Sequence, residues 1–333
     1  MSHLIAIVGP TAVGKSALAI HLAQVFGGEI VSADSRQVFR SMDIGTAKPS
    51  PEERALVPHY LIDVVDPDQD FTIALYQELA IRAIEDIQRR GRLALLVGGS
   101  GLYVRALVGG FRIPLVPPDA ELRRSLEEKA AAEGYMALYE ELKGVDPTAA
   151  QRIDPRNVRR VVRALEVFRT TGLPFSQLQG SSPLLQSFRT LTIGLTTARE
   201  DLYRRIDSRV DRMMEQGLVK EVEGLLERGY SLDLPAMSGL GYKQIGQYLK
   251  GEVDLSKAVQ RIKYETHRFA RHQYAWFRPN DEAIHWFEAR NGMEEPICSL
   301  IQGFLFKNTG VELAESKKRT KATDKDKLLV NQD

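Results

Sequence analysis

The sequence contains one cysteine, no long apolar run and a net charge of only +1, and each scarcity excludes a class of protein. Cys298 alone forms no internal disulfide and no multi-cysteine zinc site, so we expect a reducing, cytoplasmic location. No run approaches the roughly 20 apolar residues that span a bilayer, and the first run is short. We therefore expect neither a membrane partner nor a signal peptide.

The balanced charge also excludes a chain that is basic throughout, so a nucleic-acid surface would have to come from local clusters. The six histidines show no spacing typical of metal ligands. With 333 residues, the chain is long enough for a large core and more than one packing unit.

Short apolar segments alternate with helical patterns in the first third of the chain. Strands are predicted over Leu4–Gly9, Glu29–Asp34 and Arg92–Ser100, with a further candidate over His59–Val65. Helices are predicted between them, over Lys15–Phe26 and Thr72–Arg90. This alternation is typical of an α/β fold with a parallel sheet, in which ligands bind at the carboxyl ends of the strands.

The pattern becomes helical from Arg112 to Gln186 and returns to strand composition over Phe188–Thr196. We interpret residues 112–186 as a helical insertion into an α/β core formed by residues 1–111 and 187–306. Two long helical stretches follow, Glu200–Arg228 and Leu255–Phe277. The tail over residues 307–333 is polar and lacks apolar periodicity, so we expect it to be disordered.

The stretch GPTAVGKS, Gly9–Ser16, fits the phosphate-binding pattern G-x-x-x-x-G-K-[ST]. It lies between a predicted strand and a predicted helix, which is the context that this motif requires. Loop amides and the helix N-terminus attract phosphate oxygens, Lys15 adds a positive charge, and the Ser16 hydroxyl is suited to Mg²⁺. The sequence therefore predicts a P-loop core with a phosphate site.

The second signature of a nucleotide hydrolase, an apolar strand that ends in an acidic residue, is not clear. LALLVGGS ends in Gly-Gly-Ser, and Asp63 and Asp66 interrupt or close a weaker strand. Asp34, at the end of the second strand, is suited to accept a proton from a nucleophile. It is equally suited to cap a helix or support Mg²⁺, and the residues alone leave these roles open.

Two segments concentrate positive charge. Gln151–Arg169 has six arginines against two acids, and Lys257–Arg278 has six lysines or arginines against one acid, with aromatic residues between them. Such segments suit contacts to phosphates and stacking on bases, but they are also typical of solvated helix faces.

Several motifs occur in an order that resembles the bacterial tRNA dimethylallyltransferases, also called tRNA isopentenyltransferases. They are GPTAVGKS, VSADSRQVFRSMDIGTAKP, PHYLIDVVDP, VGGSGLYVRAL, RNVRRVVRALEV, RIDSRVDRMMEQGLVKEV, GLGYKQ and THRFARHQYAWFR. The phosphate loop is shared with many enzymes, whereas ADSRQVFRSMDIGTAKP is highly specific to this family. The resemblance spans about Leu4–Arg278 and leaves out the tail.

The resemblance implies transfer of a dimethylallyl group from dimethylallyl diphosphate to N6 of the adenosine just 3′ of the anticodon in tRNA. The phosphate loop would then hold the donor diphosphate with Mg²⁺, although such sequences are commonly labelled ATP-binding. Asp34 would act as general base, Lys15 would stabilise the leaving group, and Ser100 would lie near it, where the family usually has threonine. The implied donor-binding residues are Gly9, Pro10, Thr11, Ala12, Val13, Gly14, Lys15, Ser16 as the Mg²⁺ ligand, and Arg205 or Arg209.

We expect tRNA to contact the segment after the second strand and the two basic segments. The predicted contacts are Asp34, Ser35, Arg36, Gln37, Ser100, Arg123, Asn157, Val158, Arg159, Arg160, Val161, Arg268 and Arg271. We expect a monomer whose partners are tRNA and the donor. Two alternatives remain open: a small-molecule or nucleoside kinase with the same P-loop core, and a non-catalytic RNA-binding protein.

Overall fold

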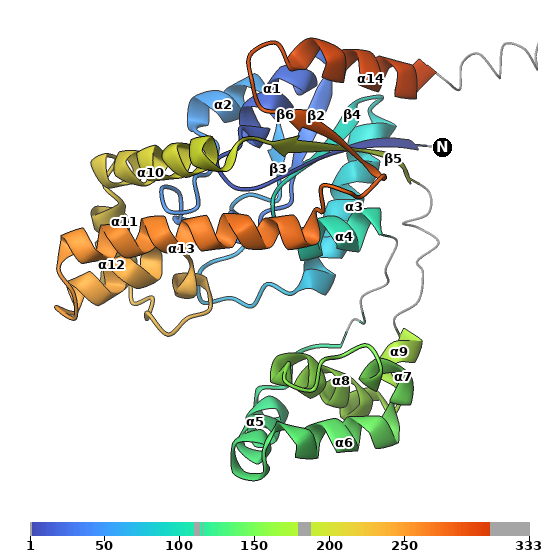
Figure 1. Ribbon diagram of the computed structural model, residues 1–333, viewed down its shortest axis with the longest axis vertical. Coiled ribbons are helices and arrows are strands. Elements are labelled where there is room, and N and C mark those ends of the chain that lie inside the picture. The colour runs from blue at the N-terminus through green and yellow to red at the C-terminus, as the bar shows by residue number, and fades with distance from the viewer. Residues whose placement is uncertain (1, 110–113, 115, 179–187, 307–333) are drawn as a thin grey trace, which may run out of the picture.

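The computed structural model describes residues 2–109, 114, 116–178 and 188–306. Within these ranges, six parallel strands form one sheet in the order β3-β2-β4-β1-β5-β6 (Figure 1). The strands are β1 Ser2–Val8, β2 Gly28–Ser32, β3 His59–Tyr60, β4 Leu93–Val97, β5 Phe188–Thr196 and β6 Ile284–Glu288. The predicted α/β class is confirmed. The predicted tail lies outside the described residues, as do residue 112 and residues 179–187 at the expected edges of the insertion.

Helices cover both faces of the sheet. Figure 1 shows α3 and α4 on one side of the sheet and α1 and α14 on the other. Leu4 and Ala6 of β1 pack against α3 and α4, whereas Ile5 and Ile7 pack against α1 and α14. This alternation follows from the two-residue period of a strand, and it explains why the central strands are apolar on both faces. The bounds are α1 Lys15–Phe26, α2 Pro51–Leu56, α3 Ile73–Arg89, α4 Gly101–Val108 and α14 Glu294–Phe306.

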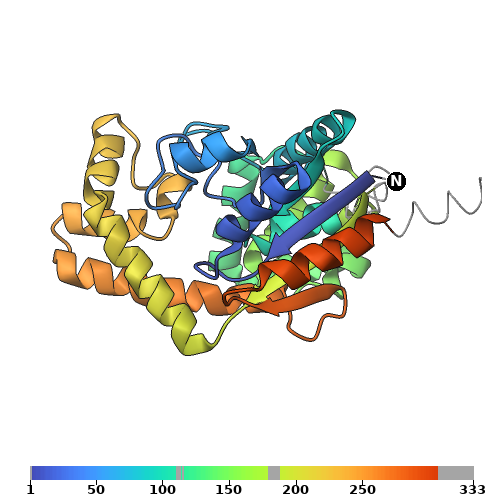
Figure 2. The same ribbon diagram turned by 90° about the horizontal axis from the view of Figure 1, so that it is seen from above.

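A second group of helices extends beyond the carboxyl end of the sheet. These are α10 Arg199–Glu215, α11 Leu218–Glu227, η2 Ala236–Ser238, α12 Tyr242–Leu249 and α13 Leu255–Trp276 (Figure 2). Their core includes Val210, Leu218 and Ile262, and it also takes in Val38 and Met42 from the segment after β2. This packing places α10 and α13 beside the strand ends.

Two sequence predictions differ from the fold, and some elements of the fold were not predicted. The expected strand over His59–Val65 is limited to His59–Tyr60, and the chain then turns through Leu61 and Asp63, both with positive φ. The helical stretch Glu200–Arg228 is two helices, because Gly217 adopts a left-handed conformation with φ of 100°. Neither β6 nor α14 was predicted.

Helices α5–α9 form a group of their own, with a separate apolar core that includes Leu138, Leu142 and Leu165 (Figure 1). Their bounds are α5 Ala120–Glu133, α6 Tyr135–Val145, α7 Pro147–Ala150, α8 Val158–Thr171 and α9 Phe175–Leu178.

One buried carboxylate connects the start of α5 to α8. Glu166 is fully buried and forms ion pairs with Arg123 at 2.8 Å and Arg163 at 2.5 Å. It also accepts a hydrogen bond of 2.8 Å from the backbone of Asp119. Its burial raises the pKa of Glu166, but these hydrogen bonds and charges outweigh the burial and lower the pKa overall.

We expect Glu166→Ala to destabilise the α5–α9 group by about 3 kcal/mol, since it leaves two arginines and one amide without their shared acceptor. This value is the lower end of the usual range, because both arginines are partly exposed. Chemical denaturation followed by circular dichroism measures the change, and limited proteolysis locates it. The matched control is Glu128→Ala, at an exposed position of α5. Equal stability of the two variants would contradict the prediction.

Candidate active site

The loop between β1 and α1 has the backbone geometry that a phosphate cradle requires. Gly9 and Gly14 have φ of 142° and 107°, which L side chains rarely adopt. A Cβ at Gly9 would also lie 2.5 Å from the carbonyl oxygen of Leu195 on β5. The chain therefore turns sharply at the strand end, and the loop runs directly into the N-terminus of α1, which favours anions.

Lys15 and Ser16 begin α1 and face a cleft of about 1650 Å³. The Lys15 ammonium donates a 2.7 Å hydrogen bond back to the carbonyl of Pro10. The pKa of Lys15 is lowered to about 7, chiefly by burial and secondarily by the positive charge of Arg209, while Asp34 acts in the opposite direction. An anion in the loop would therefore strengthen the charged form of Lys15.

Two arginines of α10 reach the same loop. Arg209 donates to the Thr11 hydroxyl at 3.1 Å, and Arg205 donates to the carbonyl of Val13 at 3.3 Å and that of Ala289 at 3.1 Å. The sequence left a choice between these two arginines, and the structure places both against the loop. Burial lowers the pKa of Arg209, and Asp34 partly offsets that effect.

Asp34 follows β2 and lies across a small cavity from Lys15. This cavity, of about 80 Å³, is lined by residues that include Thr11, Lys15, Ser16, Asp34 and Gly99. The Asp34 carboxylate accepts a 2.9 Å hydrogen bond from the backbone of Arg36, so its orientation is fixed by the turn that follows it. The phosphate loop and the Asp34 carboxylate therefore line the same cavity.

Ser100 supports the turn that carries Asp34. Its hydroxyl accepts a hydrogen bond from the Ser35 amide at 3.0 Å and donates to the Ser35 hydroxyl at 3.3 Å. The Ser100 amide in turn donates to the carbonyl of Ala33. The predicted pair of Asp34 and Ser100 is therefore brought together at neighbouring strand ends.

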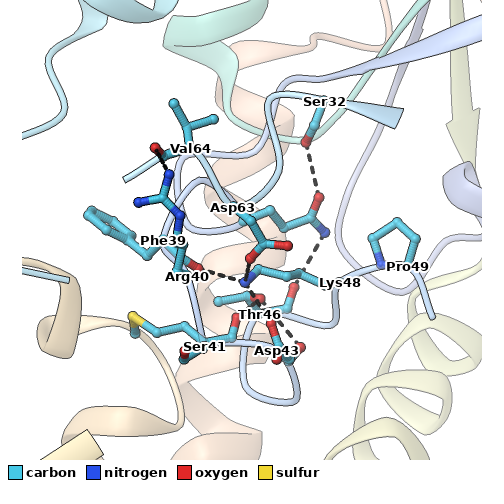
Figure 3. A network of polar contacts seen from close by, with 12 residues as sticks. Ser32, Phe39, Arg40, Ser41, Asp43, Thr46, Lys48, Pro49, Asp63 and Val64 are labelled. Carbon is cyan, nitrogen blue, oxygen red and sulfur yellow. Dashed lines mark hydrogen bonds and ion pairs between the residues drawn. The ribbon is translucent and has the colours of Figure 1, made fainter. Parts of the chain in front are cut away.

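A loop over residues 40–49 forms one wall of the cleft, and a buried lysine organises it (Figure 3). The side chain of Lys48 is only 2% exposed and contacts the Phe39 carbonyl at 2.6 Å, Asp43 at 2.7 Å and Asp63 at 2.5 Å. Arg54 pairs with the other oxygen of Asp63 at 2.8 Å. Burial raises the pKa of Asp63, but its bonds to Lys48 and Arg54 outweigh this and hold the pKa below its usual range.

Glu221 of α11 also holds this loop. Its carboxylate accepts hydrogen bonds from the amides of Asp43, Ile44 and Gly45 at 2.9, 2.7 and 3.1 Å, and from the Tyr242 hydroxyl at 2.6 Å. A Cβ at Gly45 would lie 2.5 Å from the Tyr242 ring. The motifs DIGTAKP and GLGYKQ thus meet in one contact that fixes the cleft wall.

Several predicted tRNA contacts have internal partners. Arg36 donates to the carbonyls of Pro235 and Ala236 and to Ser238. Gln37 accepts from Ser32 and donates to the carbonyls of Thr46 and Ala47. Arg123 pairs with Glu166, as described above.

In α8, some residues of the motif RNVRRVVRALEV pack inside the protein and others are exposed to solvent. Asn157 caps the helix by accepting a hydrogen bond from the Arg160 amide, and Val158 packs against the edge of the α5–α9 core. The side chain of Val161 is buried in the α5–α9 core, so a contact with RNA would involve its backbone, and this contact stays a prediction. Arg159 and Arg160 are exposed. On α13, Arg268 is exposed, and Arg271 is exposed with one hydrogen bond to the Tyr203 hydroxyl.

Three residues that organise the site were not predicted from the sequence: Lys48, Glu221 and Gln273. All three lie within motifs that carry the family resemblance, which was one available signal. A second signal for Gln273 was its place between Ala270 and Phe277 at helical spacing, as a polar residue on a buried, apolar helix face. In the ranges that the structure describes, no group of three or more His, Cys, Asp or Glu residues could hold a metal ion. No helix in these ranges is long and apolar enough to cross a bilayer.

The family model described as "IPP transferase" matches residues 37–280. This chain belongs to the IPP transferase family. It is 58% identical over 278 residues to a tRNA dimethylallyltransferase of Roseiflexus castenholzii, covering 84% of this chain and 90% of that protein. It is 48% identical over 305 residues to a tRNA dimethylallyltransferase of Dehalococcoides mccartyi, covering 92% and 93% of the two chains.

Solved structures of this family have the same architecture. The full-length tRNA isopentenylpyrophosphate transferase of Bacillus halodurans matches with a TM-score of 0.69 and 41% identity, covering 94% of this chain and 99% of the other. A eukaryotic dimethylallyltransferase acting on tRNA matches with a TM-score of 0.76 and 27% identity, covering 92% and 80%.

The lowered pKa of Lys15 predicts that binding of a diphosphate takes up a proton. Above pH 7 the free lysine is largely neutral, and the bound anion raises its pKa, so affinity should fall as pH rises, by up to about tenfold per unit. An organic diphosphate monoester is fully ionised above pH 8, because the second pKa of a phosphate monoester is about 6. Calorimetry at pH 8 and pH 9 measures both affinity and proton uptake.

The control for this measurement is Lys15→Met, which removes the titrating group and should abolish the pH dependence together with most of the affinity. Equal affinity of the wild-type protein at pH 8 and pH 9 would contradict the prediction.

Proposed function

We propose that this chain transfers a dimethylallyl group from dimethylallyl diphosphate to N6 of the adenosine immediately 3′ of the anticodon in tRNA. Family membership and the tRNA dimethylallyltransferases among the relatives support tRNA prenylation. The observation that carries the finer proposal is the cavity that the phosphate loop and Asp34 line together. A leaving diphosphate and a nucleophilic amine need these two features within one space.

The donor side is built to stabilise an anion. Loop amides, the N-terminus of α1, and the cations Lys15, Arg205 and Arg209 surround the space in which the diphosphate would lie. Charge that develops on the leaving group meets groups that are already oriented toward it, which is the most effective form of electrostatic catalysis.

Mg²⁺ fits this side of the site. The Ser16 hydroxyl is exposed at the cleft, and Mg²⁺ commonly takes one or two protein oxygens together with phosphate oxygens and waters. When bound, the ion would neutralise part of the diphosphate charge.

Asp34 would serve as the proton acceptor. As the bond between the allylic carbon and the ester oxygen of the first phosphate breaks, N6 of adenine forms the new bond to that carbon. The proton of N6 passes to the Asp34 carboxylate, so that diphosphate and the neutral modified adenosine are released. The Ser35–Ser100 contact keeps the carboxylate at the edge of the cavity. The adenosine must leave its stack to reach this position.

The exposed arginines of α8 and α13 are the proposed contacts to the anticodon stem-loop, and a monomer suffices because both site loops belong to one chain. The kinase alternative lacks support, since both candidate acids are already paired: Asp63 with Lys48 and Arg54, and Asp66 with Arg40. The phosphate loop by itself suits either donor.

The function is tested by incubating the protein with Mg²⁺, tRNA and dimethylallyl diphosphate and analysing the nucleosides by mass spectrometry. Wild-type protein should yield N6-isopentenyladenosine. Asp34→Asn keeps the shape but removes the proton acceptor, so transfer should fall by about two to four orders of magnitude. Binding of tRNA should change far less, because no phosphate contact is removed.

The matched control is Asp68→Asn, at an exposed position away from the cleft, and it should behave as wild type. Product formation should not require or consume ATP. Stoichiometric ATP hydrolysis would favour the kinase, and tRNA affinity without product would favour an RNA-binding protein. Near-normal transfer by the Asp34 variant would exclude it as the base.

Salt dependence tests the RNA-binding surface. Arg159→Gln and Arg268→Gln should each make the slope of log affinity against log salt shallower by about one unit, since each removes one phosphate contact. The double variant should flatten the slope further, because the two residues lie on separate helices. Arg82→Gln, on the exposed face of α3, is the control. Unchanged slopes in all variants would place the RNA surface elsewhere.

A further inference from the structure

Gln273 connects the two loops that the proposed reaction brings together. It lies on α13, its side chain is buried, and the residue is only 4% exposed. Its Oε1 accepts a 2.8 Å hydrogen bond from the amide of Thr11, and its Nε2 donates a 2.9 Å hydrogen bond to the carbonyl of Gly99. The side-chain amide of Gln273 therefore hydrogen-bonds to the backbone of two loops, one that follows β1 and one that follows β4.

The surrounding backbone leaves little room for any other arrangement. A Cβ at Gly99 would lie 2.2 Å from Nε2 of Gln273, and a Cβ at Gly101 would lie 2.2 Å from the Trp276 ring. The turn after β4 therefore packs directly on two side chains of α13. Gln273 therefore adds a second connection between the two loop segments, beside the backbone hydrogen bond of 3.2 Å from the Gly98 amide to the carbonyl of Ile7.

Each loop carries one half of the site. Thr11 belongs to the phosphate loop, and Arg209 holds its hydroxyl from the other side. Gly99 precedes Ser100, whose hydroxyl holds the turn that follows Asp34. A change in the distance between Thr11 and Gly99 therefore changes the distance between a bound diphosphate and the carboxylate that accepts the proton.

We infer that Gln273 is a positioning residue, which fixes the donor loop and the base-bearing turn at the separation that the transfer step requires. This inference rests on the proposed function. It assigns to Gln273 no contact with either substrate. Reaction rates are steep functions of such separations, and a displacement of about 1 Å can cost about a hundredfold.

Two substitutions separate positioning from simple stabilisation. Gln273→Met preserves the side-chain length but removes both hydrogen bonds. Gln273→Glu keeps the acceptor for Thr11, but its ionised form repels the Gly99 carbonyl. The protonated form of this glutamate can again donate to Gly99, and burial favours that form. Gln260→Met, at an exposed position of the same helix, is the matched control.

We expect Gln273→Met to lower the single-turnover rate constant by about 10- to 100-fold. Donor and tRNA affinities should stay within about threefold of wild type, because Lys15 and the exposed arginines are untouched. The rate of Gln273→Glu, divided by the wild-type rate at the same pH, should rise between pH 8 and pH 5.5. The ratio for Gln273→Met should not change with pH. Gln260→Met should match wild type throughout.

Wild-type transfer, measured in parallel, distinguishes failure of this inference from failure of the proposed function. If wild type forms product and Gln273→Met retains its rate, Gln273 does not position the loops. Loss of donor affinity in proportion to rate, or unfolding of both variants at the assay temperature, would likewise overturn the inference. Either outcome would mark the residue as a structural support of the phosphate loop.

Discussion

The structure depends on a close approach of backbone to backbone at the carboxyl end of the sheet. A Cβ at Gly98 would lie 2.1 Å from the carbonyl oxygen of Ala33, and a Cβ at Gly9 would lie 2.5 Å from that of Leu195. Side chains at these positions would push the strand ends apart. With glycine there, the loops after β1, β2 and β4 lie side by side, and Lys15 and Asp34 line one cavity.

In the free protein, the cations Lys15 and Arg209 lie near a single carboxylate, that of Asp34, so positive charge exceeds negative charge around the cavity. Burial works against the charged forms of Lys15 and Arg209, and Asp34 is the carboxylate whose charge opposes this effect for both. The cost of holding such cations near each other is offset by the packing of α10 and α13 on the sheet. A bound polyanion would relieve this repulsion, so ligand and fold should stabilise each other.

Much of the fold and part of the site could be predicted from local patterns. The sequence shows apolar strands that end in a glycine loop or in polar residues. This pattern predicted that Lys15, Asp34 and Ser100 lie at one edge of a parallel sheet. Gln273 and Glu221 could not be placed in this way, because each acts on backbone more than 170 residues distant in the chain. The family motif RNVRRV contains residues with different structural roles. Asn157 caps α8 and Val161 is buried, whereas the arginines are exposed, and the motif match alone does not separate these roles.

The register of the sheet constrains how this chain can be made. The central strand β1 pairs along its whole length with β5, from Ser2 with Phe188 to Val8 with Gly194. At about 5 to 20 residues per second, a ribosome needs about 10 to 40 seconds to reach the second strand of this pair. During that time the α5–α9 group can fold, because its core residues all lie between Leu122 and Phe175 and are made before β5. Until β5 is made, one edge of β1 stays unpaired. That edge could pair with another chain, and a chaperone that covers it would prevent such pairing.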